Sequence, residues 1–179
     1  TINMERVFTD YYKTKAADAK IKEAREELRD KLKARDTDAR AVEDKYNEAR
    51  KASQNPLLNE ADQKAKLRES EDLKADLQDR VKALRNFEQT EQQALMGRYE
   101  NARKILVDEI LEVVRDYATS NQFDLVLDNS GMTSNRLPAV VFAKAQYEIS
   151  DEILARLNQK APAASKPAEP ADATPAPGK

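Results

Sequence analysis

The side chains that most often perform catalysis are absent from this sequence. Its 179 residues include no His, no Cys and no Trp. This excludes Ser-His-Asp and Cys-His catalysis, a thiolate nucleophile and a zinc site built from Cys and His. Carboxylates and lysines remain, but no pair of them is marked as an acid and a base held in different surroundings. The sequence therefore predicts a protein that is not an enzyme and has no cofactor.

One cluster of side chains has the oxygen ligands that calcium prefers. Asp124, Asp128 and Asn129 lie just before Gly131, and calcium-binding loops are built from such residues. However, their spacing does not match a calcium-binding loop, and no Glu follows at its twelfth position. The sequence favours a solvated turn here and predicts no metal site.

Charge is abundant and evenly mixed. Charged residues make up 36% of the chain, and the formal net charge is −2. Acids and bases alternate throughout, so no continuous basic stripe is available to replace the counterions of a nucleic acid. We therefore expect no nucleic-acid partner.

The longest apolar run is residues 137–143, far short of the ~20 residues that cross a bilayer. The sequence thus predicts no membrane-spanning helix and leaves peripheral contact with a membrane open. Its first four residues read like the inside of a strand, so we expect that a signal peptide was removed upstream of Thr1.

Two long segments have the composition of helices exposed to water. Residues 5–54 and 60–119 are rich in Ala, Leu, Lys, Arg, Glu and Gln, which favour helices. Pro56 cannot continue the first helix, and Asn59 is suited to cap the second. The pattern predicts an antiparallel helical hairpin, here called the arm, over residues 9–120 with its turn near 54–60.

The seam of this hairpin, meaning the side chains that face between its two helices, is interrupted by charges. Asp18, Arg25 and Arg35 occupy positions where a coiled coil has apolar residues. We therefore expect loose packing, with few buried contacts near the tip at residues 45–70. Apolar side chains at the edge of the seam are candidates for contacts with a bound polypeptide: Leu95, Met96 and Tyr99.

After residue 120 the pattern changes from helical to alternating. Residues 123–128 and 140–142 predict short strands, and Ile2 with Met4 suggests another. Ser150 is placed to cap a last helix over residues 151–158.

The fold class is therefore α+β, with a small β body formed by residues 1–8 plus 121–160. Such a body is too small to be stable alone, so we expect copies of the chain to associate. The predicted interface is apolar: Ile2, Met4, Leu125, Leu127, Val140 and Phe142. Residues 161–179 contain seven Ala and five Pro, which predicts a disordered tail.

The order of these elements resembles the Skp (OmpH) family of periplasmic chaperones. Residues 2–8 resemble the opening strand and helix start of that family, and residues 123–128 its central "DLV-D" strand. Residues 148–154 resemble its closing "D-I-T-x-x-V-L" motif. The resemblance covers about residues 1–160 and depends on the order of the motifs around a hairpin.

The resemblance implies a jellyfish-like homotrimer whose β body is completed by three chains. Its three arms would enclose a cavity for unfolded outer-membrane proteins, which it would hold without ATP in the periplasm. The residues alone equally allow a structural coiled-coil adaptor that binds a folded partner. A prefoldin-like chaperone fits less well, because its strands lie between the two helices.

Overall fold

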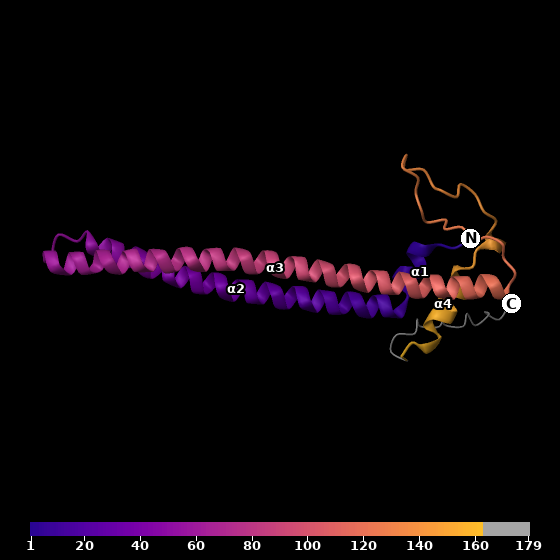
Figure 1. Cartoon of the computed structure of the whole chain (residues 1–179), viewed down its shortest axis with the longest axis horizontal. Coiled ribbons are helices and arrows are strands. Elements are labelled where there is room, and N and C mark those ends of the chain that lie inside the picture. The colour runs from indigo at the N-terminus through magenta and orange to yellow at the C-terminus, as the bar shows by residue number, and fades with distance from the viewer. Residues whose placement is uncertain (163–179) are drawn as a thin grey trace, which may run out of the picture. The chain divides into compact units, whose positions relative to one another are not determined.

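The computed structural model describes residues 1–162, and this part of the chain is mostly helical. The α-helices are α1 (Met4–Asp10), α2 (Tyr12–Ser53), α3 (Glu60–Ser120) and α4 (Ser150–Leu157) (Figure 1). Short 3-10 turns cover Ala145–Tyr147 and Asn158–Lys160. All but the first two residues of the tail predicted at 161–179 lie outside the described residues.

The chain divides into two compact units. We call Ala19–Asn101 the arm unit, and Thr1–Asp18 together with the chain from Ala102 onward the body unit. The arm unit contains most of α2 and the first two thirds of α3, whereas the body unit draws on both ends of the sequence.

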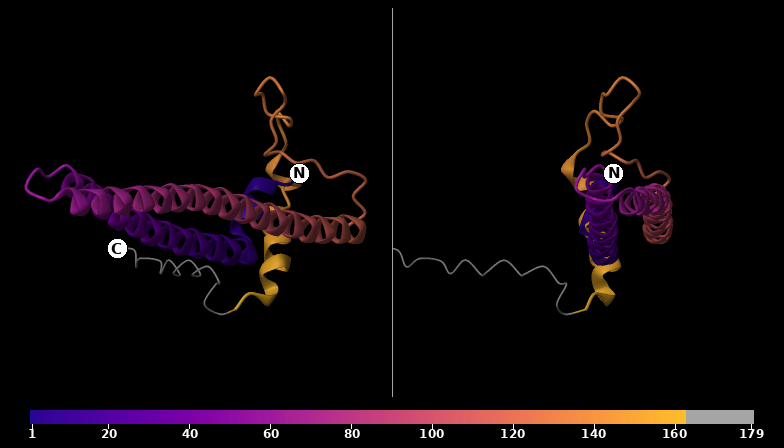
Figure 2. Two further views of the ribbon diagram at one scale, coloured as in Figure 1. Left: turned by 60° about the vertical axis from the view of Figure 1, so that its left-hand side comes forward. Right: turned by 90° about the vertical axis from the view of Figure 1, so that its left-hand side faces the viewer.

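In the arm unit α2 and α3 run side by side in opposite directions (Figures 1 and 2). The turn between them follows the predicted chemistry. The side chain of Asn55 accepts from the N–H of Leu57 at 3.0 Å. Asn59 accepts from the N–H of Asp62 at 2.8 Å and so caps α3, as predicted. The predicted helical hairpin is confirmed.

Few side chains of the arm unit are buried. The buried ones are Ala39, Val42, Ala49 and Ser70. Two of these, Ala49 and Ser70, lie within residues 45–70, where every other side chain is exposed or half-buried, so few side chains are buried near the tip, as predicted. These buried side chains are small, and no large apolar residue of the arm unit is buried. Between residues 19 and 38 the described side chains are exposed or half-buried.

The body unit has a helical core. Ile110 of α3, Ile153 of α4 and Val7 of α1 are fully buried and belong to one cluster. The other buried members come from both ends of the chain: Ile2, Tyr11, Leu106, Val114, Ile149 and Leu157. This core brings together the first 11 residues and the last described helix, so the body unit cannot form without both ends.

Three local predictions for the body unit were wrong, and helix ends explain each one. Met4 was predicted in a strand but begins α1, because Asn3 accepts from the N–H of Arg6 at 2.8 Å and caps the helix. The first long helix is broken at Tyr11, whose backbone is extended. Ser150 begins α4 but does not cap it, since its Oγ accepts from the N–H of Asn3 instead.

The expected strands are reduced to single bridges within residues 1–162. Ile2 pairs with Asp128 in parallel, and Met132 pairs with Pro138 in antiparallel fashion. A strand needs a neighbour along its whole length to pair its N–H and C=O groups. Segments 123–128 and 140–142 find no such neighbour in the described part of one chain. Within residues 1–162 the structure thus shows the predicted hairpin, and the predicted β body is not confirmed.

Candidate functional site

The body unit exposes a contiguous set of large apolar side chains, here called the apolar face. Its members are Phe123, Leu125, Leu127, Val140 and Phe142, and they line an open pocket of about 690 Å³. Leu125 is 72% exposed and Phe142 is 80% exposed. Because exposed apolar area of this kind is unfavourable in water, such patches mark sites of association.

The structure separates the six predicted interface residues into two groups. Leu125, Leu127, Val140 and Phe142 lie together on the apolar face. Ile2 is buried in the core of its own chain, and Met4 packs against that core. Sequence reasoning missed Phe123, whose ring packs edge-on against Tyr117 with 6.0 Å between centroids. Its alternation with Leu125 and Leu127 could have indicated it.

The segment that carries the apolar face is fastened to α1 by Asp128 and its neighbours. Ile2 donates to the carbonyl of Leu127 at 2.9 Å and accepts from the N–H of Asn129 at 2.8 Å. The carboxylate of Asp128 accepts from the N–H of Met4 at 3.2 Å. It also accepts from the N–H of Ser130 at 2.9 Å. The bond from Met4 satisfies an N–H group in the first turn of α1, which has no partner within that helix.

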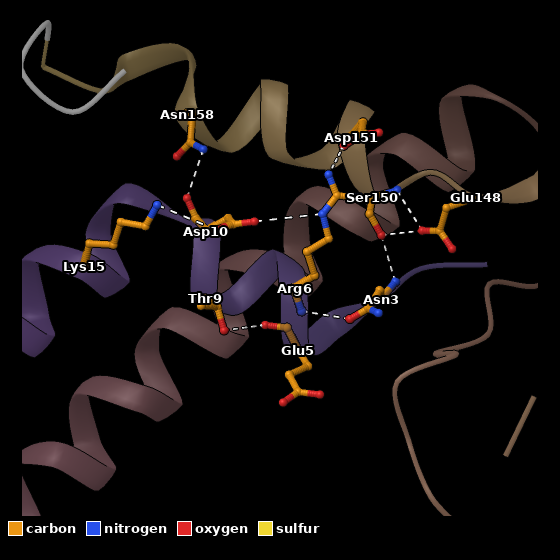
Figure 3. Close-up of polar contacts among 10 residues, drawn as sticks. All are labelled: Asn3, Glu5, Arg6, Thr9, Asp10, Lys15, Glu148, Ser150, Asp151 and Asn158. Carbon is orange, nitrogen blue, oxygen red and sulfur yellow. Dashed lines mark hydrogen bonds and ion pairs between the residues drawn. The ribbon is translucent and has the colours of Figure 1, made fainter. Parts of the chain in front are cut away.

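A second carboxylate, that of Glu148, accepts hydrogen bonds at the C-terminal end of the same segment. It accepts from the amide of Asn129 at 2.6 Å and from the hydroxyl of Thr1 at 3.3 Å. Ser150 donates to it through both its N–H and its hydroxyl. The hydroxyl of Ser150 then accepts from the N–H of Asn3 at 2.8 Å (Figure 3). We call Asp128 and Glu148 with these donors the clasp.

The clasp favours the charged form of both carboxylates. Burial acts to raise the pKa of Glu148, but hydrogen bonds from Ser150, Asn129 and Thr1 outweigh it and lower that pKa overall. At Asp128 burial again acts to raise the pKa, and the bonds from Ser130 and Met4 lower it. Among the described residues neither carboxylate is in an ion pair within 4.0 Å. Asp128 is exposed in its turn, and it also accepts from the first N–H of α1, which comes from a distant part of the sequence.

Comparison with known families shows the family to which the chain belongs. A sequence model described as "Outer membrane protein (OmpH-like)" matches residues 1–157. This chain belongs to the OmpH-like (Skp) family. No curated protein matches the sequence. Both clasp carboxylates lie in segments that carry the resemblance, Asp128 at the end of 123–128 and Glu148 at the start of 148–154.

The break between α1 and α2 in this OmpH-like chain is held by Asn158. Its Oδ1 accepts from the N–H of Tyr12 at 3.0 Å, and its Nδ2 donates to the carbonyl of Asp10 at 3.3 Å. Arg6 of α1 pairs with both Asp10 and Asp151 (Figure 3). Asn158 follows α4 and was not predicted to act here, because nothing in the local sequence links it to residue 12.

A small polar cluster lies where α2 begins, beside the body core. Lys13 forms an ion pair with Glu109 of α3. Hydrogen bonding to Glu109 is the main cause that raises the pKa of Lys13. Tyr11 beside them is buried, and this burial together with Glu109 raises its pKa to about 12. The cluster keeps Lys13 charged and Tyr11 neutral at physiological pH, which suits a structural contact.

The three predicted contact residues of the arm unit lie on α3. Met96 is 63% exposed and Tyr99 is 39% exposed, whereas Leu95 is half-buried. Between Arg85 and Arg98 α3 has no basic residue. This part of the arm unit offers apolar and amide side chains, and its charged residues are the acids Glu88 and Glu91.

Neither a metal-binding group nor a membrane-spanning helix is found in the described residues. Within residues 1–162 no group of three or more acidic side chains is arranged to hold a metal ion. None of the helices in that range is long and apolar enough to span a membrane.

Proposed function

We propose that this OmpH-like protein is a holding chaperone of the periplasm, which binds unfolded outer-membrane proteins without ATP and prevents their aggregation. The observation that carries the proposal is the family match over residues 1–157. The absence of His and Cys from the sequence supports a function in binding rather than in catalysis.

The working form is a homotrimer in which the apolar faces of three chains meet. Leu125 and Phe142 are too exposed to be left in water. Segments 123–128 and 140–142 would find their strand neighbours in adjacent copies, which would complete an α+β body from residues 1–8 plus 121–160. The bridge between Ile2 and Asp128 supplies a first pairing on which such a sheet can extend.

The arm, residues 9–120, would hold the unfolded chain through many weak contacts. Leu95, Met96 and Tyr99 are the proposed contact residues. Met is flexible and polarisable, so it adapts to different side chains. Both charge signs alternate along the arm, so we expect Coulomb attraction to contribute less than apolar contact.

The test is light scattering from a urea-unfolded outer-membrane β-barrel protein that is diluted into buffer with one trimer per barrel chain. We expect scattering to fall without ATP, and to stay low when salt is raised to about 0.3 M, because salt screens exposed charges but not apolar contacts. An inert coiled coil at equal concentration is the control. Scattering equal to that control would reject the chaperone in favour of the coiled-coil adaptor, and protection lost in salt would reject only the apolar mechanism.

A further inference from the structure

The apolar face is carried by a segment that has little regular structure of its own. Residues 121–149 contain no α-helix, and the only helical turn in them is Ala145–Tyr147. The backbone bonds of Ile2 and the side chains of the clasp connect this segment to α1 and α4. The shape of the face therefore depends on contacts made at residues 127–130 and 148–150.

These contacts come from neutral donors, which makes them sensitive to the charge on each acceptor. An ionised carboxylate accepts stronger hydrogen bonds than a neutral carboxyl group, and protonation also replaces an acceptor site by a donor. Each clasp carboxylate accepts at least three bonds. Loss of its charge would weaken all of them together.

Apart from Lys144, the charged groups named on the surrounding elements are engaged elsewhere or are acids. On α1 these groups are Glu5 and Arg6, and Arg6 is paired with Asp10 and with Asp151 of α4. The α-amino group of Thr1 donates to the carbonyl of Tyr147. Lys144 lines the pocket of the apolar face. Neutral hydrogen-bond donors therefore decide the charge state of the clasp.

We propose that Asp128 and Glu148 are positioning residues whose negative charge holds the apolar face in the shape needed to bind a second copy of the chain. The inference rests on the proposed function, because it takes self-association through the apolar face as given. The carboxylates touch no bound polypeptide, and they act through Leu125, Leu127 and Phe142.

The sign of the pH effect follows from the direction of the pKa shifts. Both pKa values are lowered in the folded chain, so their contribution is fully present above the unfolded values of roughly 4. It is lost as the pH falls through the lower folded values. Assembly should therefore release protons, up to about two per chain, and weaken in acid.

The experiment measures the association constant of the full chain by sedimentation between about pH 7 and pH 3, the range over which carboxylates titrate. The variants are Asp128→Asn, Asp128→Ala and Glu148→Ala, with Glu152→Gln on the exposed side of α4 as the matched control. Asn caps helices nearly as well as Asp. We expect Asp128→Asn to assemble more weakly than the wild type at neutral pH, because a neutral amide accepts weaker bonds than a carboxylate, and to show about one proton less of pH dependence.

Asp128→Ala and Glu148→Ala should each weaken assembly at neutral pH by about tenfold or more, as expected when charged hydrogen bonds are lost. Hydrogen exchange at Ile2 and Asn129 checks that the clasp has opened while the core at Ile110 stays protected. Equal pH dependence in wild type and Asp128→Asn, or wild-type assembly in both Ala variants, overturns the inference.

The two levels of the proposal fail in distinguishable ways. A wild-type chain that stays monomeric at neutral pH overturns the trimer and the clasp together. Assembly with the expected pH dependence, combined with no protection in the light-scattering test, overturns the chaperone function and leaves the clasp standing.

Discussion

The arm unit and the body unit are stabilised in opposite ways. In the arm unit, contacts follow from two helices of simple composition, and the buried residues are small. In the body unit, hydrogen bonds join residues about 146 positions apart, such as Asn3 with Ser150 and Tyr12 with Asn158. A surface spread along the arm tolerates change at any one position, whereas the body depends on a few particular residues.

The largest effect should come from a charge on the apolar face. Leu125→Asp would place a carboxylate in the proposed interface, where an unpaired charge costs several kcal/mol. Leu125 is 72% exposed in the single chain, so the fold of the chain should survive. Sedimentation should show monomers at micromolar concentration.

Leu57→Asp is the matched control for that variant, because Leu57 is 91% exposed in the turn between α2 and α3. It should assemble like the wild type. If Leu125→Asp remains trimeric while keeping its helical signal, the interface lies in the arms and the contrast between the two units is reversed.

A smaller effect compares the two units with the same substitution. Val7→Ala in the body core should cost about 2 kcal/mol, because it removes two methyl groups and leaves a cavity. Val42→Ala in the arm unit should cost about 1 kcal/mol or less, since two helices can shift to close the gap. Hydrogen exchange resolved by region measures the loss of stability in each variant, with both variants at the same protein concentration.

Equal losses at Val7 and Val42 would show that the two units are packed to the same degree. A larger loss at Val42 would contradict the account directly, because it would place the more rigid packing in the arm unit.

The smallest effect concerns Gly97, beside the exposed Met96. A Cβ at residue 97 would meet no atom within 4 Å, and Ala is favoured over Gly inside a helix by about 1 kcal/mol. Gly97→Ala should slow amide exchange in the surrounding part of α3 by about fivefold. Gly131→Ala, outside any helix, is the control and should leave exchange in α3 unchanged.

The sequence predicted the features that are determined by neighbouring residues, and it did not predict those that depend on residues far apart in the chain. Pro56 and Asn59 act within a few residues, and the turn they specify is where it was predicted. Asn158 and Ser150 act on residues at the other end of the chain, so no local pattern could reveal their roles. The apolar face was predicted because its side chains alternate, but the clasp beneath it depends on three segments that meet only in the fold.

The strands were the least predictable element for a related reason. Residues 123–128 have the alternation of a strand, yet a strand exists only with a neighbour, and that neighbour is absent from residues 1–162 of one chain. Met4 shows the opposite case, since the cap at Asn3 outweighs the alternation of Ile2 and Met4.

The central claim is that chains meet through the apolar face and hold an unfolded barrel protein together. The most direct measurement is the native mass of the full chain, alone and after mixing with a urea-unfolded outer-membrane β-barrel protein. We expect the mass of three chains alone, the mass of three chains plus one barrel chain after mixing, and no such complex from Leu125→Asp. Monomers alone, or three chains that do not bind the barrel protein, would contradict the account.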